Sequence, residues 1–124
     1  MRRPTPLAEQ LAWWRNATET GDGTVIGDQP RCGWFKVREK ARSKTWLPAR
    51  IWLEQPVDWE TGDLTAPETF VLQIAEQTWT DEMAVAERWL WLRPATVKEW
   101  QWLTARLALH RNLNGTERPT FISA

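Results

Sequence analysis

The side chains best suited to recognise a ligand recur with a period of two along two short segments of this chain. They are Trp34, Lys36 and Arg38 in the first segment, and Trp46, Arg50 and Trp52 in the second. Indole rings stack on nucleobases, while guanidinium and ammonium groups bind phosphate and other anions. The six residues therefore predict a binding site for an anionic ligand, a nucleotide or a nucleic acid.

The composition of the chain also favours binding over catalysis. Eleven of its 124 residues are Trp and none is Tyr. A domain of this size cannot bury eleven indoles, so some must lie at the surface, where Trp is enriched at contact sites. Lys and Arg together number 16, as do Asp and Glu, so the net charge is zero. This balance argues against the general nucleic-acid affinity of a strongly basic domain.

No group of residues supports an enzymatic reaction. The single histidine, His110, falls late in a predicted helix, where packing or the helix C-terminus accounts for it. One His and one Cys, Cys32, cannot form a zinc site. The acids have no spacing that pairs two carboxylates, and no glycine-rich phosphate loop is present. We predict a protein that is not an enzyme and that uses no metal and no cofactor.

Hydrophobic periodicity predicts a single α+β domain over residues 1–124. The expected elements are a helix over about 6–20, a β-hairpin over about 33–54, a strand over about 69–76, and helices over about 81–92 and 97–112. Thr5 precedes Pro6 as an expected N-cap of the first helix. These elements would form a small antiparallel sheet of three or four strands, packed by two or three helices.

The predicted hairpin places the six ligand-binding candidates on one face of the sheet, because side chains alternate along a strand. The other face carries apolar residues and should point to the core: Phe35, Val37, Leu47, Ala49, Ile51 and Leu53. A helix could cover the first face as well. Trp34, Trp46 and Trp52 would then form a second layer of core, with Arg50 between indole rings.

The last predicted helix is apolar on two sides. Thr96 and Glu99 form a capping box at its start. One apolar stripe contains Trp100, Leu103 and Leu107, and the opposite one contains Trp102, Leu109 and Leu113. A helix of this kind is buried between layers or shared with a partner. The second stripe is therefore a candidate protein interface, either for a homodimer or for a host protein.

The chain shows no membrane span and no secretory signal, and its single cysteine fits a reducing compartment. We therefore expect a cytoplasmic protein without membrane contacts.

Three sequence runs resemble a set of short phage and prophage proteins with no known activity. They are GWFK at 33–36, WLPARIWLEQPVDWETGDL at 46–64, and Arg93–Thr96 followed by Trp100–Leu103. The resemblance covers most of residues 5–110, although residues 42–45 replace a Gly-Gly-Pro turn that is frequent in the set. It implies a phage accessory protein acting in the host cytoplasm. An alternative to ligand binding is inhibition of a host defence or replication protein, or a role in assembly, through the Trp-rich last helix and the acidic segment 54–87.

Overall fold

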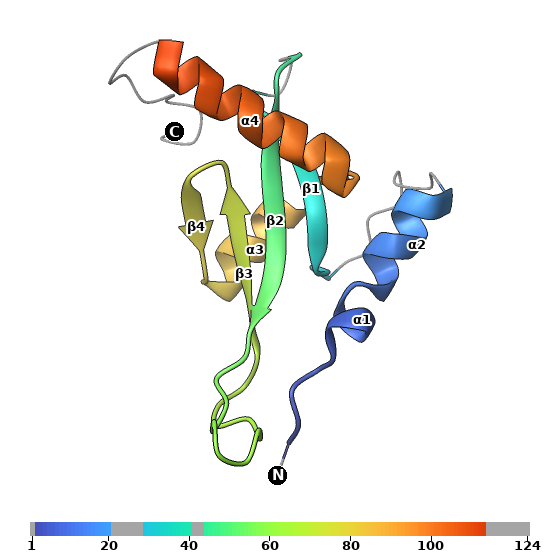
Figure 1. Cartoon of the computed structure of the whole chain (residues 1–124), viewed down its shortest axis with the longest axis vertical. Helices are drawn as coiled ribbons and strands as arrows, with labels where there is room; N and C mark the ends of the chain where they lie inside the picture. Colours follow the sequence, from blue (N-terminus) through green and yellow to red (C-terminus); the bar gives the residue numbers. More distant parts are fainter. Residues whose placement is uncertain (1, 21–28, 41–43, 114–124) are drawn as a thin grey trace.

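The computed structural model describes residues 2–20, 29–40 and 44–113, and it has an α+β fold built on one antiparallel sheet (Figure 1). Within these residues the sheet has five strands in the order β4-β3-β2-β1-β5. Their bounds are Gly33–Arg38 (β1), Trp46–Glu54 (β2), Thr69–Ile74 (β3), Gln77–Trp79 (β4) and Arg93–Pro94 (β5). The predicted fold class is confirmed, with five strands where three or four were expected.

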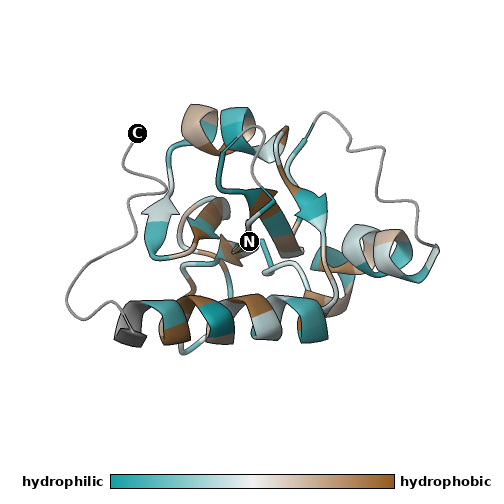
Figure 2. Cartoon of the chain, turned by 90° about the horizontal axis from the view of Figure 1, so that it is seen from above, coloured by the Kyte–Doolittle hydropathy of each residue, from teal (hydrophilic) through white to brown (hydrophobic). Residues whose placement is uncertain are grey.

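Two helices cover opposite faces of the sheet, and two more lie at the edge formed by β1 and β5 (Figures 1 and 2). Their bounds are Leu7–Gln10 (α1), Ala12–Thr20 (α2), Glu82–Trp89 (α3) and Val97–Leu113 (α4). The helix expected over 6–20 is divided at Leu11. The expected cap by Thr5 is wrong, because Pro6 is the N-cap residue and makes no side-chain capping bond.

The two additional strands are both short and lie at the edges of the sheet. The strand expected over 69–76 ends at Ile74, where Ala75 adopts a φ of 53° and the chain turns back into β4. Alanine rarely adopts a positive φ, so the local sequence carries no turn signal. In β5, Pro94 lies opposite Phe35 on the outermost strand, where a missing N–H is tolerated.

The main hydrophobic core lies between the sheet and α3. The hairpin register places Phe35 opposite Ala49 and Val37 opposite Leu47, so the apolar residues of β1 and β2 share one face. Trp89 of α3 is fully buried, and its ring meets that of Phe35 edge-on with centroids 5.3 Å apart. This face therefore packs as the alternation in the sequence predicts.

Residues 55–68 extend beyond the sheet between β2 and β3, and we call them the arm (Figure 1). The N-terminal segment binds along it: the Leu64 amide donates to the Arg2 carbonyl at 2.8 Å. Glu68 accepts hydrogen bonds from the Thr5 hydroxyl at 2.8 Å and the Thr5 amide at 3.1 Å. Gln55 donates to the same carboxylate at 2.6 Å. Glu68 thus joins both sides of the arm to the N-terminal segment.

The Glu68 anchor should weaken in acid. The hydrogen bond from Gln55, followed by those from Thr5 and the charge of Arg2, lowers the pKa of the Glu68 carboxyl, against the opposing effect of its burial. A pKa lowered by folding contributes stability above the unfolded-state pKa of about 4.3, and this stability is lost as the pH falls through the folded-state pKa.

We therefore expect amide exchange of the N-terminal segment to be slower in the wild type than in E68Q at neutral pH. The difference should shrink as the pH falls below about 4.3 and disappear once the pH is below the folded-state pKa of Glu68. E60Q, at an exposed position of the same arm, should exchange like the wild type at neutral and at acidic pH. A wild-type advantage that persists in acid would contradict this role of the carboxylate.

Candidate ligand-binding site

The six predicted ligand-binding residues share the sheet face on which α4 packs. The register pairs Trp34 with Arg50 and Arg38 with Trp46 across the hairpin. α4 crosses the upper part of β1 and β2 (Figure 1), and Pro48 on this face is buried. The three indoles predicted for this face, at positions 34, 46 and 52, are each half-buried. The face is therefore neither fully open nor fully converted into core.

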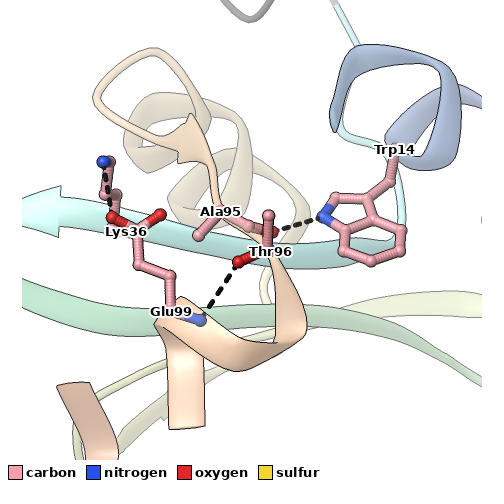
Figure 3. A network of polar contacts seen from close by, with 5 residues as sticks. All are labelled: Trp14, Lys36, Ala95, Thr96 and Glu99. Carbon is pink, nitrogen blue, oxygen red and sulfur yellow. Dashed lines mark hydrogen bonds and ion pairs between the residues drawn. The ribbon is translucent and has the colours of Figure 1, made fainter. Parts of the chain in front are cut away.

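In the half of this face around Trp46, the charged groups already interact with other groups of the protein. Lys36 Nζ and the Arg38 guanidinium each lie 4.9 Å from the centroid of the Trp46 ring. Lys36 also forms an ion pair of 2.9 Å with Glu99 in the first turn of α4 (Figure 3). The Glu99 amide donates to Thr96 Oγ1 at 3.1 Å, as the capping box predicts, but its carboxylate binds Lys36.

The other half presents an arginine between two tryptophans. The Arg50 guanidinium carbon lies 5.2 Å from the centroid of Trp34, directly across the hairpin, and 5.5 Å from that of Trp52 on its own strand. Arg50 is exposed, and among the residues that the structure describes no carboxylate forms an ion pair with it. We call Trp34, Arg50 and Trp52 the ladder. A cation–π contact does not consume the N–H donors of an arginine, so this guanidinium can still bind an anion.

Trp14 of α2 fixes the position of Trp34. Its indole N–H donates to the Trp34 carbonyl at 2.7 Å. It also donates to the Ala95 carbonyl at 3.0 Å, the bond drawn in Figure 3. The Trp14 and Trp34 rings are 4.9 Å apart at an angle of 58°. Trp13, the preceding residue, contacts Phe35 on the opposite face of the sheet. Sequence analysis missed this role, for which two adjacent tryptophans on one helix were the available signal.

Gly33, next to Trp34, provides the space for this contact. A Cβ atom at Gly33 would lie 2.6 Å from the Trp14 Cβ and closer still to its ring, and Gly33 has a φ of 153°. Both the space and the backbone conformation therefore require glycine.

One group considered for catalysis, the thiol of Cys32, is shielded within the protein. Cys32 is buried, and this burial, together with the charge of Glu68, raises the pKa of its thiol to about 11. Such a thiol stays protonated, and hence a poor nucleophile, at neutral pH. In the described ranges, no three His, Cys, Asp or Glu side chains are placed to hold a metal ion. None of the helices described is both long and apolar enough to cross a membrane.

The predicted protein interface lies on the side of α4 that faces away from the sheet. Leu103 is buried against the sheet, whereas Trp102 and Leu109 are exposed. The side chain of Leu113, the last residue of α4, lies outside the described part of the chain. Sequence analysis missed a second group of exposed apolar residues at α3, for which the seven-residue spacing of Met83 and Leu90 was a signal.

No protein-family model matches this chain, and no curated protein or solved structure matches it significantly. The resemblance to phage and prophage accessory proteins therefore stays a prediction based on the sequence motifs.

Proposed function

We propose that this protein is a non-catalytic binding module whose ladder binds a nucleotide or a single-stranded nucleic acid. The observation that carries the proposal is the position of Arg50, which is exposed, in cation–π contact with Trp34 and Trp52, and without a carboxylate partner in the described residues. An indole offers its face to a base, and the guanidinium offers its edge to the phosphate next to that base.

The geometry of this face limits the length of nucleic acid that the ladder can engage. Trp46 and Trp52 lie on one face of β2, six residues apart, which corresponds to about 20 Å along a strand. Pro48 is buried between them where α4 crosses β2, so a ligand on the ladder does not continue along β2 to Trp46. The affinity should therefore increase with oligonucleotide length only until both indoles of the ladder are engaged.

The electrostatic part of this binding should be modest. The protein has no net charge, and Lys36 is already neutralised by Glu99. Few phosphates are therefore contacted, so that the salt dependence should be shallow compared with that of a basic domain. Stacking contributes about 1–3 kcal/mol for each base, so two indoles suffice for binding in dilute solution.

The test is the fluorescence anisotropy of a labelled oligothymidylate of about 20 nucleotides titrated with protein at about 50 mM NaCl. We expect R50A and W52A each to weaken binding roughly tenfold or more. The matched control is R106A, because Arg106 also lies over a tryptophan, Trp102, but on the outer side of α4. Its affinity should equal that of the wild type at protein concentrations where both proteins are monomeric.

Two results would contradict the proposal. One is an unchanged anisotropy at protein concentrations up to about 100 µM. The other is an equal loss of affinity in R50A and R106A, which would assign binding to general charge and not to the ladder. Circular dichroism spectra of W52A would check that this half-buried position has been changed without loss of the fold.

A second candidate function is favoured by the exposure of Trp102 and Leu109. In this alternative, the protein is an accessory protein of the phage type that acts in the host cytoplasm, as an inhibitor of a host defence or replication protein or in assembly. Trp and Arg are the residues most enriched at the energetic centres of protein interfaces. Arg106 lies 5.6 Å from the centroid of Trp102, so this face carries both.

A further inference from the structure

The outer side of α4 carries an apolar patch with positive charges. Trp102 and Leu109 are 60% and 59% exposed and seven residues apart, so they lie on the same side of the helix. Arg106, between them in the same stripe, is exposed, and so is Lys98 one turn before Trp102. The only acid between residues 97 and 110 is Glu99, whose carboxylate is bound to Lys36. We call Trp102, Arg106 and Leu109 the α4 patch.

On the outer side of α3, exposed apolar residues have the same spacing as those of the α4 patch, but the charged residue between them is acidic. Met83 and Leu90, again seven residues apart, are 72% and 65% exposed, and the adjacent Trp91 is 66% exposed. Glu87 is exposed and occupies the position in this stripe that Arg106 occupies in the other. We call Met83, Glu87, Leu90 and Trp91 the α3 patch.

The exposed charges on α3 itself and at its start are negative. Asp81 and Glu82 are exposed at the start of the helix. The one basic residue of α3, Arg88, is half-buried, with its guanidinium 4.4 Å from the centroid of the Trp79 ring and bonded to the Ala84 carbonyl. The two patches are thus complementary in charge, and each has apolar residues on both sides of its central charge.

The two patches cannot meet within one molecule. α3 turns Val85 and Trp89 toward the sheet on one face, and α4 turns Leu103 toward it on the other. Figure 2 shows the two helices on opposite sides of the sheet, so their outer surfaces point in opposite directions. Any contact between the patches must therefore join two copies of the chain.

We propose that the α3 patch of one copy binds the α4 patch of a second copy. The contact is head-to-tail, so each copy in the assembly uses both patches, and the copies form a closed ring or an open filament. Apolar residues would be removed from water at the centre, while Glu87 of one copy would face Arg106 of the next. An apolar centre with complementary charges is the usual composition of a specific protein interface. This proposal does not depend on the function of the ladder.

A charge-swap experiment tests the contact. Sedimentation velocity of the wild type between about 5 and 500 µM should show a mass that rises with concentration above the 14.5 kDa of the monomer. E87R and R106E should each remain monomeric, because each places like charges opposite one another. The double variant E87R/R106E should associate again. Equimolar mixing of the two single variants should also restore assembly, since each supplies the face that complements the other.

The matched control is W59A, which removes an exposed indole between Val57 and Leu64, the bridged pair of the arm, and should associate like the wild type. Since both exchanged residues are exposed, the single variants should retain the circular dichroism spectrum of the wild type. A wild type that stays monomeric at every concentration would overturn the proposal, as would single variants that associate normally. A double variant that fails to associate would also overturn the proposed pairing of the two charges.

Discussion

Replacing Gly33 with alanine is expected to lower the free energy of unfolding by about 3 kcal/mol or more. The added methyl group would overlap the side chain of Trp14, which is buried and held by two hydrogen bonds. The φ of 153° adds strain, because residues with a Cβ rarely adopt it. Urea unfolding followed by far-ultraviolet circular dichroism would measure the change.

Gly62→Ala is the matched control for this substitution. Gly62 also has a positive φ, of 76°, but the nearest atom to an added Cβ is the end of the Arg3 side chain at 3.8 Å. The control therefore measures the backbone cost alone, which we expect to be about 1 kcal/mol. If G33A were no less stable than G62A, the close packing of Trp14 on β1 would be contradicted.

Trp89→Ala is expected to cost about 3–5 kcal/mol, because it removes the largest fully buried side chain of the described core. The Trp89 ring lies against Trp13 as well as Phe35. Its removal would therefore leave a cavity where α3 packs on the sheet and on α2. Domains of this size are stable by roughly 5–15 kcal/mol. A substantial fraction of W89A should therefore be unfolded at 37 °C.

The control for W89A is W91A, two residues along the chain. Trp91 is exposed, so its replacement should change the unfolding free energy of the dilute monomer by less than about 0.5 kcal/mol. Equal losses in W89A and W91A would contradict the assignment of one indole to the core and the other to the surface.

The hairpin was the part of the fold best predicted from sequence. Phe35 and Val37 alternate with Trp34 and Lys36, and a period of two has only one interpretation in a half-buried strand. The start of α4 was equally clear, because Thr96 and Glu99 form a local signal that needs no tertiary contact. Features that depend only on local sequence patterns could therefore be predicted from the sequence.

The missed features depend on residues distant in the chain. β5 forms because Pro94 pairs with Phe35 of β1. The Thr5 hydroxyl does not cap the first helix because it donates a hydrogen bond to Glu68. The sequence also did not determine how far α4 covers the ligand-binding face. α4 is apolar on two sides, and its periodicity does not say which side meets the sheet. Only the three-dimensional structure distinguishes the ladder from the half of this face around Trp46, where Glu99 neutralises Lys36.

The double hydrogen bond of Trp14 also constrains when the protein can fold during its synthesis. The first acceptor, Trp34, follows Trp14 by 20 residues, but the second acceptor, Ala95, follows it by 81 residues. The helix that carries Trp13 and Trp14 can therefore complete its docking only after Ala95 has been added to the growing chain. Until then its two indoles stay accessible to chaperones, as apolar groups awaiting distant partners generally do.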